Sequence, residues 1–356
     1  MQESILGVDT VSLDEEKNAL VLVDQTLLPG EVKILSLTRR EEIFEAIASL
    51  RVRGAPAIGV AAAIGIYLAA REIQADTVDA FYAAFMPVKA YFASARPTAV
   101  NLFWALDRME RVVLQNRGLS VAEVKGLLHD EAVAIRAEDI AICHRIGENG
   151  LSLLRDGCGI LTHCNAGQLA AVRYGTALAP IHLGRERGWN FHVFCDETRP
   201  LLQGSRLSAF ELAADGVDTT VICDSMAAQV MKNGWVDAVL VGADRIAANG
   251  DVCNKIGTSG VAILAKHYGI PVYTLGPTST IDMNCPDGAH IPIELRDGDE
   301  IKNLWYEKPM ALPEVKCFNP SFDVTDHELL TGIVTEKGIC YPPFTESLAA
   351  LFKDKK

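Results

Sequence analysis

Residues 160–170, ILTHCNAGQLA, set a short apolar run directly against His163, Cys164 and Asn165. The apolar run predicts a strand in the core, and Gly167 predicts a turn that leads from this strand into a helix. A core strand that delivers a thiol to the point where the chain turns needs an explanation. The neighbouring strands must show whether this strand end serves chemistry or packing.

Strands of the same kind recur along the second half of the chain. Each is a compact, nearly continuous apolar run, as expected of strands buried on both faces of a parallel sheet. Helical segments such as LLQGSRLSAFELAADG and GTSGVAILAKHYG lie between them. This alternation predicts a doubly wound α/β domain with a parallel sheet. The strands are GILTHC (159–164), FHVFCDE (191–197), TTVICDS (219–225), DAVLVGAD (237–244) and IPVYTLGP (270–277).

The first part of the chain follows a different pattern. ALVLVDQT and EVKILSL predict two strands joined at Pro29-Gly30. Several helices should follow, which predicts a smaller, mainly helical domain with a few antiparallel strands. The boundary is expected within 135–155, giving domains 1–145 and 146–356. The helices are expected around 40–50, in the Ala/Ile run after Pro56, from Pro97 and after Ser120.

Composition and charge argue against several classes of function. The net charge of −13 disfavours a nucleic-acid surface, because binding to phosphate backbones needs a basic face. The nine cysteines form no C-x-x-C pair, which indicates reduced thiols in a cytoplasmic protein. The apolar run 57–70 is too short to span a membrane and is interpreted as a buried helix. The N-terminus shows no signal-peptide pattern.

Sequence motifs for cofactors are missing. No predicted strand is followed by G-x-G-x-x-G, and the chain has no P-loop, no G-x-S-x-G elbow and no H-E-x-x-H. No Cys/His cluster has the spacing of a zinc site. We therefore expect chemistry carried by side chains alone, with neither a metal nor a cofactor.

Every predicted strand of the second half ends in polar residues. In an open parallel sheet the carboxyl ends of the strands share one edge, and the ligand crevice lies there. Each residue also has a structural interpretation: a lone cysteine is usually a small buried hydrophobe, a strand-end aspartate often caps a helix, and His163 could bond a backbone carbonyl. Their shared location favours an active site. The residues are Thr162, His163, Cys164, Asp196, Glu197, Thr198, Asp224, Ser225, Asp244, Thr278 and Ser279.

Three segments could hold an anion. Arg53 and Arg96 each precede a predicted helix start, where free N–H groups and the helix dipole favour negative charge. Asn254 and Lys255 are expected to open the helix that follows the strand ending at Asp244. A surface ion pair is the alternative interpretation of Arg53 and of Arg96.

Five motifs then connect the chain to a known family. They are RGAPAIG (53–59), THCNAG (162–167), DETRPLLQGSRL (196–207), GADRIAANGD (242–251) and NKIGT (254–258). With these motifs in this order, nearly the whole chain resembles the 5-methylthioribose-1-phosphate isomerase family. The resemblance implies a cofactor-independent, homodimeric enzyme with a Rossmann-like C-terminal domain, and it implies Cys164 and Asp244 as the catalytic pair. The substrate contacts that it implies are Arg53, Gly54, Ala55, Arg96, Gln203, Asn254 and Lys255.

The resemblance also implies a reaction, in which a cyclic aldose 1-phosphate becomes a ketose 1-phosphate. We expect a buried Asp244 to protonate the ring oxygen. Cys164 should be favoured as a thiolate by the helix expected after it and remove the C2 proton, and a hydride shift from C2 to C1 is the alternative. Related proteins act on ribose 1,5-bisphosphate or 5-deoxyribose 1-phosphate, or are regulatory subunits of an initiation-factor exchange complex. The presence of both Cys164 and Asp244 favours an isomerase over a regulatory subunit.

Overall fold

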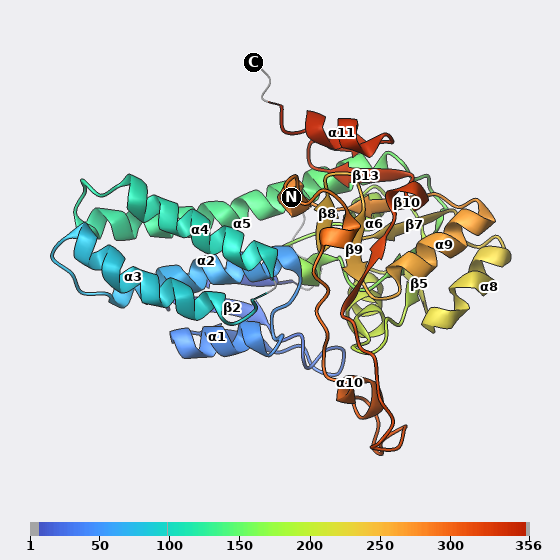
Figure 1. The fold of residues 1–356 in the computed structure, drawn as a ribbon, viewed down its shortest axis with the longest axis horizontal. Coiled ribbons are helices and arrows are strands. Elements are labelled where there is room, and N and C mark those ends of the chain that lie inside the picture. Colours follow the sequence, from blue (N-terminus) through green and yellow to red (C-terminus); the bar gives the residue numbers. More distant parts are fainter. Residues whose placement is uncertain (1–6, 98, 354–356) are drawn as a thin grey trace. The chain divides into compact units, whose positions relative to one another are not determined.

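A computed structural model describes residues 7–97 and 99–353, and the chain divides into two compact units (Figure 1). Unit 1 comprises Met1–Cys143 and Gln168–Gly175, and unit 2 comprises His144–Gly167 and Thr176–Lys356. The first crossing between the units falls inside one continuous helix, α5 (Val121–Leu151), close to the expected boundary at residue 145. The return of Gln168–Gly175 to unit 1 was not predicted.

Unit 1 combines a small antiparallel sheet with a set of helices. Its elements are β1 (Val11–Asp14), β2 (Ala19–Val23), β3 (Ile34–Leu37), α1 (Arg40–Ala48), α2 (Ala55–Glu72), α3 (Val78–Ala93), α4 (Val100–Gln115) and most of α5. In the sheet, Leu22 of β2 lies opposite Val11 of β1 and Leu35 of β3. The predicted hairpin of β2 and β3 is confirmed, whereas β1 was not predicted.

The core of unit 1 is built around α2. Its sequence is rich in alanine, the strongest helix former, and Pro56 lies in the first turn, where its missing N–H costs no hydrogen bond. All residues from Ala57 to Ala70 are buried. Among the described helices, α2 alone is long and apolar enough to cross a membrane, and 78% of that window is buried inside the protein. The predicted buried helix is therefore confirmed.

Helix α3 was not predicted from the sequence. Pro87 lies in its interior, where proline removes a backbone hydrogen bond and argues against a helix. Three buried aromatic side chains, Phe81, Phe85 and Phe92, anchor the same helix in the core. Their burial offsets the local cost of the proline, and this tertiary contribution is not visible in the local pattern.

The main sheet of unit 2 contains all five predicted strands. Its strands are β4 (Gly159–His163), β5 (His192–Asp196), β6 (Asp218–Ile222), β7 (Ala238–Val241), β10 (Val272–Leu275), β13 (Gly332–Thr335) and β14 (Gly338–Cys340). The order is β14-β13-β10-β7-β4-β5-β6, and every neighbouring pair is parallel except β13 with β14. The predicted parallel sheet is confirmed, and β13 and β14 extend it beyond the prediction.

Helices cover both faces of this sheet. Leu161, Val239 and Val241 share a core with α8 (Ala227–Lys232), α9 (Thr258–Tyr268) and α11 (Phe344–Ala350). Leu275 projects from the alternate face, where it and Pro180 of α6 (Ala179–Glu186) pack closely against Gly150 at the end of α5. Helix α7 (Ala209–Ala214) connects the β5 region to β6. The arrangement is the predicted doubly wound fold.

A second sheet of unit 2 was not predicted. It consists of β8 (Arg245–Ala247), β9 (Val252–Lys255), β11 (Ile281–Asp282) and β12 (Phe322–Thr325), in the order β11-β8-β9-β12. Between β11 and β12 the chain makes an excursion that carries α10 (Asp299–Lys302).

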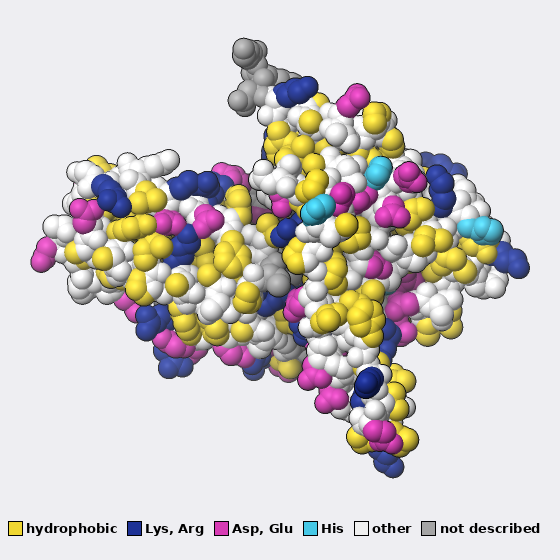
Figure 2. Space-filling model, viewed as in Figure 1, with side chains coloured by type: hydrophobic (Ala, Val, Ile, Leu, Met, Phe, Trp, Pro, Cys, Tyr) yellow, Lys and Arg dark blue, Asp and Glu magenta, His cyan; other side chains and the backbone are white. Residues whose placement is uncertain are grey.

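The excursion is bonded to the loop after β5 through Trp305. Trp305 Nε1 donates to the Pro200 carbonyl at 2.9 Å, and the Arg206 guanidinium lies 4.6 Å from the centre of the Trp305 ring. Large apolar side chains are exposed on the excursion, and Figure 2 shows hydrophobic atoms gathered around α10. These exposed residues are Met283, Leu295, Trp305, Tyr306, Met310, Leu312, Val315 and Phe318.

Candidate active site

The strand order places a topological switch point between β4 and β7. From β4 the chain adds β5 and β6 on one side, and it then returns to add β7 and β10 on the other. His163, the last residue of β4, lies opposite Val241, the last residue of β7. Cys164 and Asp244 therefore leave the sheet from the carboxyl ends of neighbouring strands. Open α/β sheets bind their ligands at this position.

Cys164 is buried and has a left-handed backbone. Its φ is 68°, a region that residues other than glycine rarely adopt. Its N–H donates to Thr198 Oγ1 at 2.8 Å, and its carbonyl accepts from Ser208 Oγ at 2.7 Å. The prediction of a helix directly after the cysteine was wrong. In the described chain a three-residue 3-10 turn, Gln168–Ala170, follows Cys164, and the next α-helix, α6, begins only at Ala179. A helix dipole therefore cannot be the cause of a thiolate here.

Asp244 is only partly buried, less than the sequence reasoning expected. The reason is its place in a connection between β7 and β8 rather than inside a strand. Its backbone N–H donates to the Cys253 carbonyl at 2.9 Å, which fixes Asp244 beside β9. The Cys253 thiol does not compete with Cys164 as a base, because burial, together with the charge of Asp244, raises the pKa of Cys253 to about 12. Burial likewise raises the pKa of Cys195.

Asn254 and Lys255 lie at the end of β9 and not at a helix start, as was expected. The buried Asn254 donates from Nδ2 to Thr258 Oγ1 at 3.0 Å. Lys255 Nζ donates to the Ser321 carbonyl at 2.8 Å and lies 4.3 Å from the centre of the Phe322 ring. The Ser321 carbonyl and the Phe322 ring thus hold the Lys255 ammonium group against the start of β12.

The first N–H groups of α9 already have an acceptor. The Asp323 carboxylate accepts from the Gly257 N–H at 2.8 Å and from the Ser259 N–H at 3.2 Å. A carboxylate at this position also satisfies the helix dipole. The anion site expected at this helix start was therefore wrong, and an anion beside β9 would be bound by side chains, above all by Lys255.

Gln203 presents a buried polar atom that lacks a partner. Its side chain is 5% exposed, and within residues 7–97 and 99–353 its Oε1 accepts no hydrogen bond. Gln203 precedes a single π-helical turn, Gly204–Ser208, which passes so close to β5 that a Cβ on Gly204 would lie 1.7 Å from the Asp196 carbonyl oxygen. An unpaired buried oxygen is costly unless a ligand supplies a donor. Gln203 is therefore suited to a ligand that carries hydroxyl groups.

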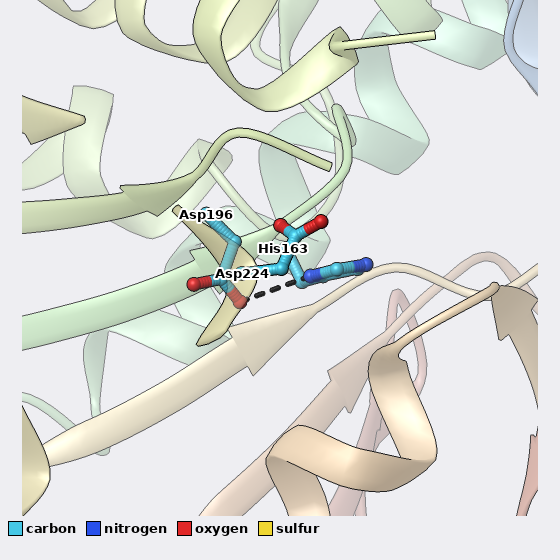
Figure 3. Close-up of side chains that lie close together, drawn as sticks. All are labelled: His163, Asp196 and Asp224. Atoms are coloured by element: carbon cyan, nitrogen blue, oxygen red, sulfur yellow. Dashed lines mark hydrogen bonds and ion pairs between the residues drawn. The ribbon is translucent and has the colours of Figure 1, made fainter. Parts of the chain in front are cut away.

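His163, Asp196 and Asp224 form a compact group of ionisable side chains at the same edge of the sheet (Figure 3). Atoms of the three that could ligate a metal lie within 4.8 Å of one another. Hydrogen bonds already occupy the histidine: Nδ1 donates to Asp196 Oδ2 at 2.9 Å, and Nε2 donates to the Ile256 carbonyl at 2.8 Å. A metal ligand needs a ring nitrogen with a free lone pair, so His163 does not fit that role.

The histidine and Asp196 instead form a buried hydrogen-bonded pair, and burial raises the pKa of the Asp196 carboxyl. Burial alone would lower the pKa of His163, but the hydrogen bond and the charge of Asp196 outweigh this effect and raise it. The carbonyl that His163 binds is next to Lys255 in the chain, and a Cβ on Gly257 would lie 2.7 Å from His163 Cε1. The structural interpretation of His163 is thus confirmed, and its bond to the Ile256 carbonyl helps to hold the backbone that follows β9.

Sequence reasoning placed Thr198 and Asp224 at this edge only as polar strand ends, without a role, and it missed Ser208. Asp224 accepts the backbone N–H groups of Thr198 and Arg199 at 2.7 and 2.8 Å, which shapes the loop after β5. Thr198 and Ser208 hold the backbone of Cys164. Ser208 directly follows the motif at residues 196–207, and this position was the signal that could have found it.

Unit 1 contains the remaining predicted contacts. Arg53, Gly54 and Ala55 lead into α2, which begins at Ala55 with Pro56 in its first turn, as predicted. That turn carries no acidic residue, so its N–H groups can favour an anion. Gly54 has a φ of 92°, and a Cβ there would lie 2.4 Å from Ala170 Cα, so only glycine fits.

Arg96 is followed by a turn rather than directly by a helix. The Ala99 N–H donates to the Arg96 carbonyl at 3.0 Å, and α4 begins at Val100 instead of at Pro97. The anion site expected at a helix start beside Arg96 was wrong in this respect. The guanidinium of Arg96, rather than free helix N–H groups, would have to hold an anion here.

A doubly wound sheet whose switch point combines a thiol, a carboxyl and a buried amide defines an α/β protein with a small-molecule site at the carboxyl edge of its sheet. Residues 51–342 match the family model described as the Initiation factor 2 subunit family, and the chain belongs to that family.

Named relatives extend over nearly the whole chain. The methylthioribose-1-phosphate isomerase of Symbiobacterium thermophilum is 62% identical over 349 residues, 98% of this chain and 97% of that protein. The 5-deoxyribose 1-phosphate isomerase of Petrotoga mobilis is 58% identical over 348 residues, 98% of this chain and 100% of that protein. The crystal structure of 5-methylthioribose 1-phosphate isomerase from Pyrococcus horikoshii OT3 superimposes with a TM-score of 0.91 at 43% identity and covers 97% of this chain and 96% of that one. The predicted fold and the predicted enzyme class, an isomerase, are confirmed.

Proposed function

We propose that this chain is an aldose–ketose isomerase that converts 5-methylthioribose 1-phosphate to 5-methylthioribulose 1-phosphate in methionine salvage. The observation that carries the proposal is the position of Cys164 and Asp244 after neighbouring strands at the switch point. A thiol and a carboxyl at one ligand-binding edge supply the base and the acid that isomerisation needs. The names of the relatives support the class of substrate.

The reaction begins with ring opening, because the phosphate on the anomeric oxygen keeps the sugar cyclic. Asp244 donates a proton to the ring oxygen as the bond from C1 to that oxygen breaks. Cys164, as the thiolate, removes the C2 proton, and the electron pair forms a C1–C2 double bond. The Asp244 carboxylate then takes the proton of the C2 hydroxyl while Cys164 returns a proton to C1. The product is the ketose 1-phosphate, and both side chains regain their starting states.

Transfer of hydrogen from C2 to C1 as a hydride is the alternative route. In that route Cys164 shapes a water-poor site and does not carry the proton. Turnover in deuterated water, with deuterium at product C1 measured by mass spectrometry, separates the two. Substantial incorporation supports proton transfer through Cys164, and incorporation far below one deuterium per turnover supports either the hydride route or a thiol shielded from solvent.

The substrate contacts complete the proposal. We propose that seven residues, named at the end of this paragraph, contact the phosphate and the hydroxyl groups of the substrate. The partly buried Lys255 supplies a fixed positive charge, and Gln203 supplies the buried oxygen that needs a donor. We also infer a cytoplasmic homodimer, for which light scattering should give twice the chain mass of 38.5 kDa. The contacts are Arg53, Gly54, Ala55, Arg96, Gln203, Asn254 and Lys255.

A comparison of substrates tests the function. The kcat/KM values for the 5-methylthio, 5-deoxy and 5-phospho derivatives of ribose 1-phosphate should be highest for the methylthio compound. The name of the Petrotoga relative favours 5-deoxyribose 1-phosphate as a second substrate. Cys164→Ser is the matched control for background conversion. A preference for the 5-phospho compound, or no turnover of any of the three, would contradict the proposal.

A further inference from the structure

The loop between β5 and α7 holds the backbone of Cys164 from both sides. We propose that Thr198 and Ser208 are positioning residues that fix Cys164 in its left-handed conformation and thereby aim its thiol at the substrate. The inference rests on the proposed function in one respect, the role of Cys164 as the base. It concerns residues that never need to touch the substrate.

Thr198 has a defined hydrogen-bonding role. Its hydroxyl donates to the Asp196 carbonyl at 3.0 Å, so the oxygen is left to accept the Cys164 N–H at 2.8 Å. The Thr198 N–H in turn donates to the Asp224 carboxylate at 2.7 Å, and Thr198 is fully buried with a φ of 63°. The threonine is thus fixed by its own backbone before it binds Cys164.

Ser208 fixes the other side of the same residue. Its hydroxyl donates to the Cys164 carbonyl at 2.7 Å and accepts from Asn165 Nδ2 at 3.2 Å. Ser208 is also fully buried. In both residues the hydroxyl is donor and acceptor at once, so its removal takes one hydrogen bond from a neighbour on each side.

These bonds matter for the direction of the thiol because the backbone angles of a residue set its Cα–Cβ direction. A cysteine without such support favours the extended or right-handed regions over a φ near 68°. With either hydroxyl removed, Cys164 would relax toward those regions and point its sulfur elsewhere. A misplacement of about 1 Å in a reacting group can cost about 100-fold in rate.

The test compares hydroxyl-removing variants with matched controls. Thr198→Val and Ser208→Ala each remove one bond to Cys164, and Thr198→Ser keeps the oxygen. Thr274→Val is the control, because Thr274 is also fully buried, lies on β10, and its hydroxyl bonds no described residue. Thr198→Val and Ser208→Ala should lower kcat about 10- to 100-fold with KM changed less than about twofold. In Thr198→Ser and Thr274→Val, kcat should stay within about threefold of its value in the unchanged protein.

A second measurement reads the backbone without any turnover. Hydrogen exchange of the peptide that contains Cys164 should accelerate in Thr198→Val and not in Thr198→Ser or Thr274→Val, because the Cys164 N–H loses its acceptor only in the first. Equal damage by Thr198→Ser and Thr198→Val, or a loss of kcat in Thr274→Val as large as in Thr198→Val, would overturn the inference. If Thr198→Val fails to fold, Ser208→Ala decides by its kcat. If the unchanged protein turns over no pentose 1-phosphate, the proposed function fails, whereas the exchange result still supports or overturns the hold on Cys164.

Discussion

Replacing Gly257 with alanine tests the contact that helps to hold the backbone after β9. A Cβ at this position would lie 2.7 Å from Cε1 and 2.9 Å from Nε2 of His163. The ring cannot move aside freely, because its two nitrogens bond Asp196 and the Ile256 carbonyl. The clash must therefore be relieved by a shift of the segment that follows Lys255.

Two costs add in Gly257→Ala. Gly257 has a φ of 106°, and a left-handed backbone costs an L-residue about 1–2 kcal/mol. An extra methyl group forced into a packed site costs about 1–3 kcal/mol more. The free energy of unfolding should thus fall by about 2–5 kcal/mol. Gly269→Ala is the matched control, because Gly269 ends the same helix with a φ of 71° but no atom of the described residues lies within 4 Å of where its Cβ would be.

Urea unfolding followed by circular dichroism measures both variants. Gly269→Ala should lose only about 1–2 kcal/mol, the backbone part of the cost. Gly257→Ala should also raise KM, since Lys255 moves with the displaced segment, whereas Gly269→Ala should leave KM unchanged. If the free energy of unfolding falls no further in Gly257→Ala than in Gly269→Ala, the reasoning that the immobile His163 ring would clash with a side chain at position 257 is refuted.

Three further predictions concern charge and polar burial. Lys255→Met should raise KM by about 10- to 100-fold, because a charged hydrogen bond left unmade costs about 1.5–3 kcal/mol; the exposed Lys266→Met is the control, and an equal KM in both variants would exclude Lys255 from binding. Gln203→Leu should lower kcat/KM without lowering the free energy of unfolding, since the unpaired Oε1 stabilises nothing in the free protein; marked destabilisation with normal turnover would assign Gln203 a structural role. Burial alone would lower the pKa of His182, but its hydrogen bond with Asp215 and the nearby Glu211 carboxylate, 3.7 Å from Nε2, raise the pKa to about 9 from 6.5. Stability from this group is therefore complete below pH 6.5 and is lost as the pH rises through about 9, by about 3 kcal/mol in all. Urea unfolding of His182→Gln across that window should show a weaker pH dependence than the unchanged protein, and parallel curves would contradict the assignment.

The main sheet was predictable because each of its strands is an apolar run that needs burial on both faces. The second sheet was not, because its strands are two to four residues long and carry polar side chains such as Asn254 and Asp323, which lie opposite each other in β9 and β12. Pairing, rather than local preference, makes these segments strands. Because this pairing is not visible in the local sequence, Lys255 was predicted at a helix start instead of at the end of a strand.

The residues of the switch point could be predicted, but not how they are held. The polar ends of β4 and β7 stand out in the sequence, and parallel topology places them side by side. The left-handed backbone of Cys164 depends on a bond to Thr198, which is 34 positions away in the chain. Tertiary hydrogen bonds impose the positive φ of Cys164, and no local sequence pattern predicts such a backbone at a cysteine.

The most direct measurement of the central claim is the turnover of Cys164→Ser and Asp244→Asn with 5-methylthioribose 1-phosphate. Each variant should keep the circular dichroism spectrum and lose about 100- to 10,000-fold in kcat, the range that general acid–base groups supply. The double variant should lose little more than the worse single one, because the two groups act on the same substrate. A folded single variant with near-normal kcat would contradict the claim that sulfur and carboxyl work as a pair.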